Sequence, residues 1–516
     1  MVDIHDETPR ESARDEDDLA RFGYKQELRR TLGAFSSFAV AFSYISPSTG
    51  IFALFFLGLT TIGGVFFWSW PIVALGQFII ALTFAELSSH YPVAGSVFQW
   101  TKYLSGKTYS WFAGWIYLFA GILTVASVCV TLPLALIPAL NGMGWNVSSS
   151  LHHQRIVAVA TLAAITILNI FGVRLVALIN NTGVIFEILG MVVFAFILAI
   201  FHNHQGVGVI FDSGGTDVNL STFLVAMFMS LYVIYGFDTA STLAEETKDP
   251  RREAPRAVIG SVIGAFVIGA IFLWALLMAI PEGGSIAQSI GPADIINANF
   301  SNAFATVYLL VVVAAIFVCC LAIQTSTIRL AFGMARDNRL PGSRALSKVN
   351  PQWHTPMWTC IAIGALAFVP MLQYTGAAIV AIAATGMIYL SYLICNLAVL
   401  RARMKGWPRT PAPFSLGRWG LPITIGGILY GGAMLVNIAW PRAATNPTPK
   451  ESGGLLDFHM AWLNDIPIFW TVVGAVIIVG AIYFFVVQRS KPSYLQAPEG
   501  EVFADEAEAA MAVAAK

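Results

Sequence analysis

Charged residues are scarce in this chain of 516 residues. Asp, Glu, Lys and Arg make up 11% of the sequence, whereas hydrophobic residues make up 57%. So few charges do not cover the surface of a soluble globule of this length. The 29 basic residues balance the 29 acidic ones, so the net charge gives no indication of nucleic-acid binding. The composition indicates a protein that lies in a lipid bilayer.

Cysteine and the common catalytic motifs are also rare or missing. The five cysteines are odd in number and lie in apolar runs, so the sequence predicts no disulfide framework. Walker A, CxxC, HExxH and GxSxG motifs are absent, and the adjacent His152 and His153 have no third metal ligand near them in sequence. These absences argue against an ATP-driven pump and against a metalloenzyme, and we expect no metal and no cofactor. The first 30 residues are rich in acids and bases, which does not suit a cleavable signal peptide.

Long apolar runs recur along the chain. A hydrocarbon core of about 30 Å needs about 20 apolar residues per helical crossing, and these runs are continuous rather than alternating as in a membrane β-barrel. The sequence therefore predicts an all-α integral membrane protein with 12 transmembrane helices. The predicted spans lie near residues 32–62, 63–85, 111–140, 154–172, 178–201, 219–244, 256–280, 303–333, 357–374, 376–400, 421–440 and 467–488.

The placement of basic residues indicates the orientation. Lys and Arg mark the cytoplasmic side of a membrane protein. With the N-terminus inside, the basic residues of the N-terminal tail and of the even-numbered connections share one side, while the opposite connections hold Arg155, Arg442 and Lys450. We expect a multi-pass protein of the cytoplasmic membrane with both termini cytoplasmic. The tails, residues 1–31 and 489–516, lack apolar periodicity and are expected to be disordered or at most a short surface helix.

The first span is interrupted by the polar stretch SYISPSTG at residues 43–50. Pro47 removes a backbone donor, Gly50 loosens the backbone, and the neighbouring hydroxyls compete for backbone partners. A helix interrupted at membrane depth is tolerated where it is buried in protein or lines a wet cavity. Taken alone, the stretch is equally compatible with a simple proline kink.

A second interruption, YGFDTAST at residues 235–242, lies in the sixth span. Because five spans separate the interruptions, spans 6–10 run opposite to spans 1–5. Broken helices at matching positions of inverted repeats indicate a transporter's binding site near the midplane. The expected units are the repeats 32–201 and 219–400, followed by helices within 421–488. The half-helix that starts near Gly50 would direct free N–H groups at a carboxylate.

Four stretches of the chain resemble the amino acid-polyamine-organocation permeases. They are STGIF at 48–52, ELSSHYPVAGSVFQWTKYLSG at 86–106, GFDTASTLAEETKDPRREAPRAVIGSV at 236–262, and TIRLAFGMARDNRLPGSRALSKVNPQWHTP at 327–356. The third stretch is the most specific, and it looks closest to the branch that carries GABA, choline and related amines. The resemblance implies the inverted five-helix repeat of the leucine transporter, with two extra helices. Ser48 and Thr49 replace part of the family's glycine-rich turn, which alters the expected carboxylate pocket.

The predicted substrate site lies at the two breaks. Asp238 is expected to meet the substrate's ammonium or to take part in proton-linked gating, because an acid at membrane depth is costly; alternatively it caps the following half-helix. Tyr232 and Tyr235 are expected to form an aromatic lid or a cation–π platform, or else simple packing, and Phe237 shares this ambiguity. The residues predicted to bind substrate are Ser46, Ser48, Thr49, Gly50, Tyr232, Tyr235, Gly236, Phe237 and Asp238.

A second set of residues is predicted to couple transport to an ion. Glu187 is an acid deep in the fifth span, and we hypothesise that it carries the proton near the first break; alternatively it is a neutral buried acid bonded to Ser or Asn. Ser326 and Thr327, with Gln324, could supply oxygens to a sodium-like site beside the first break, or serve as small interface residues. The predicted ion-coupling residues are Glu187, Asp238, Ser326 and Thr327.

An ionic cluster follows the sixth span. A solvated charge run is the default interpretation of Glu245, Glu246 and the basic residues after them. The resemblance adds the alternative that these acids pair with Lys102 or Arg336 and close an inward gate.

The sequence thus predicts a secondary transporter that takes up an amino acid or a related amine such as GABA by alternating access with protons. The expected partners are the substrate, protons or possible sodium ions, and the lipid bilayer. Choline or ethanolamine transport, amino acid exchange, and a non-transporting sensor on the same fold remain as alternatives. The short tails argue against a sensor, because a sensor usually needs a sizeable output domain.

Overall fold

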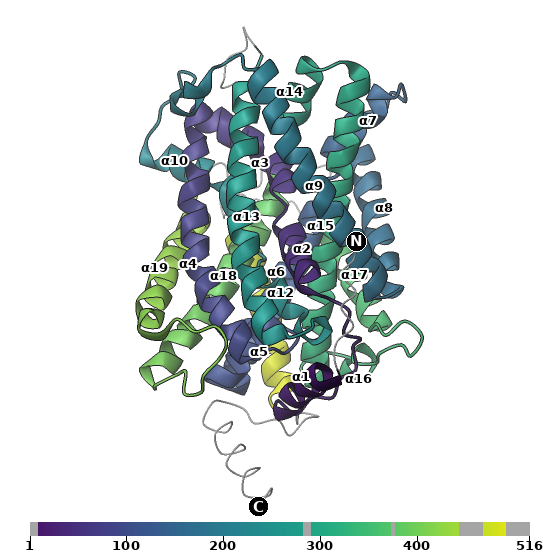
Figure 1. Cartoon of the computed structure of the whole chain (residues 1–516), viewed down its shortest axis with the longest axis vertical. Helices are drawn as coiled ribbons and strands as arrows, with labels where there is room; N and C mark the ends of the chain where they lie inside the picture. The colour runs from purple at the N-terminus through teal and green to yellow at the C-terminus, as the bar shows by residue number, and fades with distance from the viewer. Residues whose placement is uncertain (1–8, 282–289, 373–376, 443–467, 492–516) are drawn as a thin grey trace, which may run out of the picture.

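The computed structural model describes residues 9–281, 290–372, 377–442 and 468–491, and in these ranges the chain is helical. The helices pack into one bundle, with α1, α5 and α16 at one end and α14 at the other (Figure 1). We call these the α1 end and the α14 end. Within the described ranges there is no β-strand, and the β-type pairing is an isolated parallel bridge between Leu32 and Thr247.

The helices follow the chain in a regular order. Their bounds are α1 (Pro9–Arg21), α2 (Ala34–Ile45), α3 (Pro47–Ile62), η1 (Gly63–Trp68), α4 (Ser69–His90), α5 (Ser96–Ser105), α6 (Lys107–Cys129), α7 (Pro133–Gly142), α8 (Leu151–Ile170), α9 (Val173–Phe201), η2 (Val207–Phe211), α10 (Leu220–Ala226), α11 (Phe228–Val233), α12 (Thr239–Thr242), η3 (Ala244–Glu246), α13 (Pro250–Met278), α14 (Pro292–Asn299), α15 (Asn302–Arg336), α16 (Ser343–Leu346), α17 (Met357–Leu372), α18 (Ala377–Met404), η4 (Gly417–Trp419), α19 (Gly420–Ala439), α20 (Ile468–Tyr483) and η8 (Phe484–Gln488).

Each of the predicted spans has a counterpart among these helices. Within the described ranges, nine apolar helical stretches are long enough to cross a membrane, and the first, Ala34–His90, has 57 residues. At about 1.5 Å per residue, that stretch is long enough for two crossings. Two shorter apolar helices, Leu220–Val233 and Met357–Leu372, account for the remaining spans. The predicted second span, 63–85, is displaced, because residues 63–68 form the separate helix η1 before α4 begins.

The inner helices are buried and the outer ones expose apolar side chains. In the Lys107–Gly142 stretch, 83% of the most apolar window is buried, whereas only 22% of the Phe469–Gln488 window is buried. Trp70, Trp100 and Trp111 lie fully inside. The outer helices α8, α9, α19 and α20 carry exposed apolar residues that suit contact with lipid.

The N-terminal segment contains a short helix, the alternative to a disordered tail in the sequence analysis. From Pro9 to Arg21 it forms α1, and the following residues pack against the α1 end of the bundle. Arg30 Nη1 lies 3.1 Å from Asp15 Oδ2, and the backbone N–H groups of Thr31 and Leu32 both donate to the Glu246 carbonyl at 2.9 Å. Some of the charges that suggested a solvated tail, such as those of Asp15 and Arg30, are therefore paired. Residues 1–8, and the tail after residue 491, lie outside the described residues.

Candidate functional site

The first break lies at Ser46. Helix α2 ends at Ile45, Ser46 has a left-handed backbone with φ of 36°, and α3 begins at Pro47. Proline suits the first position of a helix, where its missing N–H is not needed. A left-handed residue interrupts the helix instead of bending it, so the structure shows a broken span and not a proline kink. The sequence analysis expected this half-helix to start near Gly50, and in the structure it starts three residues earlier, at Pro47.

Gly50 brings the two broken spans into contact. A Cβ atom added at Gly50 would lie 2.2 Å from Cγ2 of Val233, the last residue of α11. That separation is far below van der Waals contact, so only glycine allows this approach of α3 to α11. The first half of the broken sixth span therefore lies directly against the second half of the broken first span.

The second break extends from Ile234 to Asp238, between α11 and α12. Gly236 adopts a positive φ of 86°, and a Cβ atom there would lie 1.9 Å from the Tyr44 ring. Its backbone N–H donates to the Tyr392 hydroxyl at 2.9 Å. The unwound segment is thus held between α2 on one side and α18 on the other.

Asp238 is fully buried and surrounded by hydroxyl groups. Its Oδ2 accepts hydrogen bonds from Ser96 at 2.8 Å and from Tyr117 at 2.5 Å. Its Oδ1 accepts one from Tyr392 at 2.5 Å. Asp238 stands at the N-cap position of α12, but its side chain makes no capping hydrogen bond, so the helix-cap interpretation is wrong. The acid connects the second break to α5, α6 and α18.

Glu187 lies at the first break. Its Oε1 accepts hydrogen bonds from Ser46 Oγ at 2.7 Å and from Ser48 Oγ at 2.6 Å, and its side chain is buried. The Thr49 hydroxyl lies 2.6 Å from that of Ser46. We call these four residues the Glu187 cluster. Both interpretations of Glu187, a proton carrier and a neutral acid bonded to serine, are compatible with these contacts.

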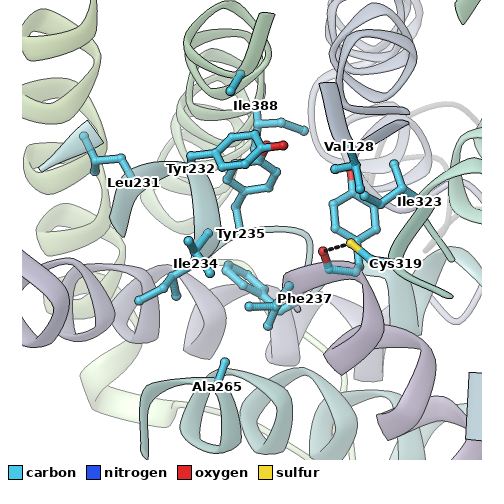
Figure 2. Packing of buried hydrophobic residues seen from close by; sticks show 14 of the residues in the cluster. Val128, Leu231, Tyr232, Ile234, Tyr235, Phe237, Ala265, Cys319, Ile323 and Ile388 are labelled. Carbon is cyan, nitrogen blue, oxygen red and sulfur yellow. Dashed lines mark hydrogen bonds between the residues drawn. The ribbon is translucent and has the colours of Figure 1, made fainter. Parts of the chain in front are cut away.

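Aromatic residues fill the space around the second break. Figure 2 shows Tyr232, Tyr235 and Phe237 near one another within the buried cluster. The ring of Tyr235 meets that of Tyr232 edge-on, with centroids 6.1 Å apart, and that of Tyr44 in the same way at 6.3 Å. The Tyr232 hydroxyl lies 3.0 Å from Ser127 Oγ, whereas the buried Tyr235 hydroxyl has no hydrogen-bond partner among the described residues.

The polar side chains of the eighth span, which were predicted to form a sodium-like site, make their hydrogen bonds with other groups. Thr239 Oγ1 donates to Ser326 Oγ at 3.3 Å, so Ser326 contacts the residue that follows the second break. The Thr327 hydroxyl donates to the Ile323 carbonyl of its own helix at 2.8 Å. Gln324 bonds to Asn169 and Thr166 on α8. The hydrogen bonds of these side chains do not support the expectation of an oxygen cage beside the first break.

Three residues that contact Asp238 were not predicted from the sequence. Ser96, Tyr117 and Tyr392 come from α5, α6 and α18. Hydroxyl side chains are common in membrane helices as packing groups, so no local signal distinguishes these from others. The Ser127 hydroxyl beside Tyr232 was missed for the same reason.

Buried ion pairs close the α1 end. Arg336 donates to both carboxylate oxygens of Glu245, at 2.9 and 2.5 Å, which agrees with one of the predicted pairings. Lys102 instead pairs with Asp337 at 2.7 Å, and Arg329 pairs with Glu246 at 2.6 Å. Burial raises the pKa of the Glu246 carboxyl above its usual range, while the Arg329 guanidinium acts in the opposite direction. These acids are buried and paired, unlike a solvated charge run.

The N-terminal segment joins this ionic region through Tyr24. The Tyr24 hydroxyl donates to Asp337 Oδ1 at 2.9 Å and accepts from Lys102 at 2.9 Å. The Arg336 guanidinium lies over the Tyr24 ring, 3.9 Å from its centroid. Burial, with the Asp337 carboxylate as the next cause, raises the pKa of the Tyr24 phenol well above its usual range. Tyr24 is therefore a neutral bridge between two buried ion pairs.

Comparison with known proteins gives an independent line of evidence. A family model described as amino acid permease matches residues 32–452. The amino-acid permease BAT1 of Arabidopsis thaliana is 27% identical over 488 residues, which cover 86% of this chain and 93% of that protein. The branched-chain amino acid permease BcaP of Bacillus subtilis is 26% identical, covering 82% and 91% of the two chains. The GABA-specific permease of Saccharomyces cerevisiae is 24% identical, covering 83% and 79%.

Among solved structures, the crystal structure of MhsT in complex with L-phenylalanine has the same fold. The TM-score is 0.55 at 12% sequence identity, and the match covers 80% of this chain and 98% of that chain. At this identity the likeness concerns the fold alone. The all-α membrane architecture with the leucine-transporter arrangement, predicted from the sequence, is confirmed.

Proposed function

We propose that this chain, which belongs to the amino acid permease family, takes up an amino acid or a related amine such as GABA by alternating access, coupled to protons. Family and fold both indicate a transporter and not an enzyme. The names of the relatives give different substrates, branched-chain amino acids in one and GABA in another. The substrate class is therefore proposed from the site.

The observation that carries the proposal is the meeting of the two broken spans. Gly50 of α3 approaches Val233 of α11, and Gly236 of the second break approaches Tyr44 of α2. Unwound backbone at this depth is tolerated where it is buried in protein or lines a cavity, and broken helices at matching positions of the repeats indicate a transporter's binding site. We propose that substrate binds between the breaks, in contact with Ser46, Ser48, Thr49, Gly50, Tyr232, Tyr235, Gly236, Phe237 and Asp238.

The chemistry of these groups suits a substrate with an ammonium and a carboxylate. The first turn of α3 carries backbone N–H groups that have no partner within the helix, and the positive end of its dipole lies at the break. Such an end attracts a carboxylate. Asp238 and the faces of Tyr232 and Tyr235 attract an ammonium group. Asp238 would have to exchange one of its hydroxyl donors for the substrate.

Proton coupling is supported by two buried acids whose hydrogen-bond partners are hydroxyls. Glu187 is bonded to Ser46 and Ser48, and Asp238 to one serine and two tyrosines. A carboxylate buried without a cationic partner favours uptake of a proton or a cation. We assign the coupling role to Glu187 and Asp238, with Ser326 and Thr327 as secondary candidates. The Ser326 hydroxyl bonds to Thr239 in α12, and the Thr327 hydroxyl bonds to the Ile323 carbonyl in α15.

We further propose that the protein lies in the cell membrane with the α1 end in the cytoplasm. Support comes from the basic residues, which gather in the N-terminal segment and in the connections at that end. In this orientation, the ion pairs around Tyr24 close the cytoplasmic side of the site.

Uptake into proteoliposomes tests the proposal. A radiolabelled panel of GABA, neutral, basic and acidic amino acids, choline and ethanolamine is offered first with a pH gradient and then with a sodium gradient. Accumulation of an amino acid or GABA under the pH gradient, abolished by a protonophore, is expected. Accumulation that requires sodium would overturn the proton coupling. Uptake that occurs only when substrate is loaded inside would identify an exchanger, and binding without movement would identify a sensor.

A further inference from the structure

We propose that Tyr392 of α18 is a positioning residue that holds the second break in its unwound conformation through its hydroxyl group. The inference rests on the proposed function in that the second break is the transport site. Neither the family match nor the sequence motifs single out this tyrosine.

The Tyr392 hydroxyl joins the main chain and the side chain of the same unwound segment. It accepts a hydrogen bond from Gly236 N–H at 2.9 Å and lies 2.5 Å from Asp238 Oδ1. A tyrosine hydroxyl has one proton to donate. Because the backbone N–H of Gly236 can only donate, the hydroxyl proton goes to Asp238. One buried oxygen atom therefore satisfies both groups, two residues apart.

The position of the Gly236 backbone N–H is fixed by its surroundings. Its backbone has a φ of 86°, outside the range of a helix, and the Tyr44 ring fills the space where a side chain would stand. A buried N–H group that loses its partner is costly. The Tyr392 hydroxyl therefore stabilises the unwound main-chain conformation at Gly236.

The Tyr392 ring is held in place independently of its hydroxyl. Phe84 of α4 packs edge-on against it, with ring centroids 4.8 Å apart, and Phe237 packs against it at 5.4 Å. The side chain is almost fully buried. Replacing tyrosine by phenylalanine would keep this packing and remove only the hydroxyl.

The two carboxylate oxygens of Asp238 accept hydrogen bonds from different partners. Oδ1 faces Tyr392, while Oδ2 faces Ser96 and Tyr117. The bond from Gly236 to Tyr392 therefore lies on the Oδ1 side, and the loss of a partner of Oδ2 leaves it in place. Tyr44, on the other side of Gly236, extends this contact to the broken first span. Tyr392 therefore connects α18 to the second break.

The test compares three Tyr→Phe variants of the full-length protein. Tyr392→Phe removes the hydroxyl bonded to Gly236. Tyr117→Phe removes a hydroxyl from Asp238 but none from Gly236, and Tyr389→Phe removes a hydroxyl on the same helix that lies 3.4 Å from Tyr430, away from the break. Hydrogen exchange of the amides of residues 234–238 is measured in nanodiscs, together with KM and Vmax of uptake.

We expect exchange of these amides to rise about tenfold or more in Tyr392→Phe, since their protection reports local opening. KM should rise about tenfold, because the substrate meets a less ordered main chain. Exchange in Tyr389→Phe and Tyr117→Phe should stay within about twofold of the parent protein. Equal exchange in Tyr392→Phe and Tyr389→Phe would overturn the proposal.

The exchange measurement does not depend on transport. If the parent protein accumulates no member of the panel, the proposed function fails, while the amides of residues 234–238 still decide the role of Tyr392. Should Tyr392→Phe not fold, 4-aminophenylalanine is incorporated at position 392, because it donates to Asp238 but accepts poorly from Gly236. Raised exchange confined to residues 234–238 in that variant supports the role, and unchanged exchange refutes it.

Discussion

The carboxylate of Glu187 accepts a hydrogen bond of 2.7 Å from the Ser46 hydroxyl, at the residue where the first span is broken. The two residues lie 141 positions apart, Ser46 between α2 and α3 and Glu187 on α9. An internal acid therefore occupies one side of the unwound turn, beside the first residues of α3. Because Glu187 bonds to Ser46, a proton on Glu187 changes a hydrogen bond of the first break, and a change in the break alters the surroundings of Glu187.

Replacing Glu187 by glutamine tests that connection. The amide keeps the shape of the side chain and an oxygen that accepts from Ser46 and Ser48, but it does not titrate. We expect uptake driven by a pH gradient to fall by about tenfold or more, and exchange of internal for external substrate to persist. Uptake is followed from external pH 5 to pH 8.

The control is Glu253→Gln at the start of α13, where the acid pairs with the exposed Arg256 at 2.8 Å. This variant should keep the pH profile of the parent protein. A Glu187→Gln protein with its full pH dependence intact would show that the coupling proton binds elsewhere.

Gly236→Ala is expected to abolish transport and lower stability. The left-handed backbone costs a non-glycine residue about 1–2 kcal/mol, and the new Cβ would overlap the Tyr44 ring. Thermal unfolding in detergent and substrate uptake measure the two effects. Gly260→Ala on α13 is the control, because its Cβ would meet Phe38 at an ordinary 3.5 Å. Equal behaviour of the two variants would contradict the conformation described for Gly236.

Gly50→Ala should separate the two broken spans. Its Cβ would lie 2.2 Å from Val233 Cγ2, so α3 and α11 must move apart. We expect uptake to fall by about tenfold or more, because the site is built from both helices. In the double variant Gly50→Ala, Val233→Ala, the missing Cγ atoms leave room and part of the activity should return. Additive losses in the two single variants and the double variant would argue against a direct contact.

The buried pair of Lys102 and Asp337 allows a thermodynamic test of the α1 end. Its side chains are only 4% and 0% exposed. Lys102→Met leaves a buried carboxylate without its cation, which costs about 3–5 kcal/mol of folding free energy in comparable pairs. Lys102→Met combined with Asp337→Asn should be less destabilised than Lys102→Met alone. Unfolding in denaturant is measured for the parent protein, Lys102→Met, Asp337→Asn and the double variant. A coupling free energy near zero from these four values would show that the pair is solvated.

The breaks were predictable because their signals are local. Pro47 and Gly50 stand within four residues of each other, and Gly236 and Asp238 interrupt an otherwise apolar span. The partners of Asp238 were not predictable, since Ser96, Tyr117 and Tyr392 lie 142, 121 and 154 residues away. A single sequence carries no distances between spans, so it does not show which hydroxyl faces which acid.

The packing of the N-terminal segment was missed for a different reason. Its acids and bases alternate without apolar periodicity, which is typical of a solvated tail. In the structure, Asp15 pairs with Arg30, and the buried Tyr24 reaches Lys102 and Asp337. Composition measures the amount of charge but not its pairing, so it underestimates order in a segment that rests on a charged surface.

The main-chain bridge before α2 determines which parts of the molecule can shift together. Leu32 donates to the Glu246 carbonyl and accepts from the Lys248 N–H, both at 2.9 Å. These bonds join the start of α2 to the turn between η3 and α13 without any side chain. A displacement of the start of α2 is therefore transmitted directly to the turn before α13. A spin label placed near the start of α2 would report such a displacement.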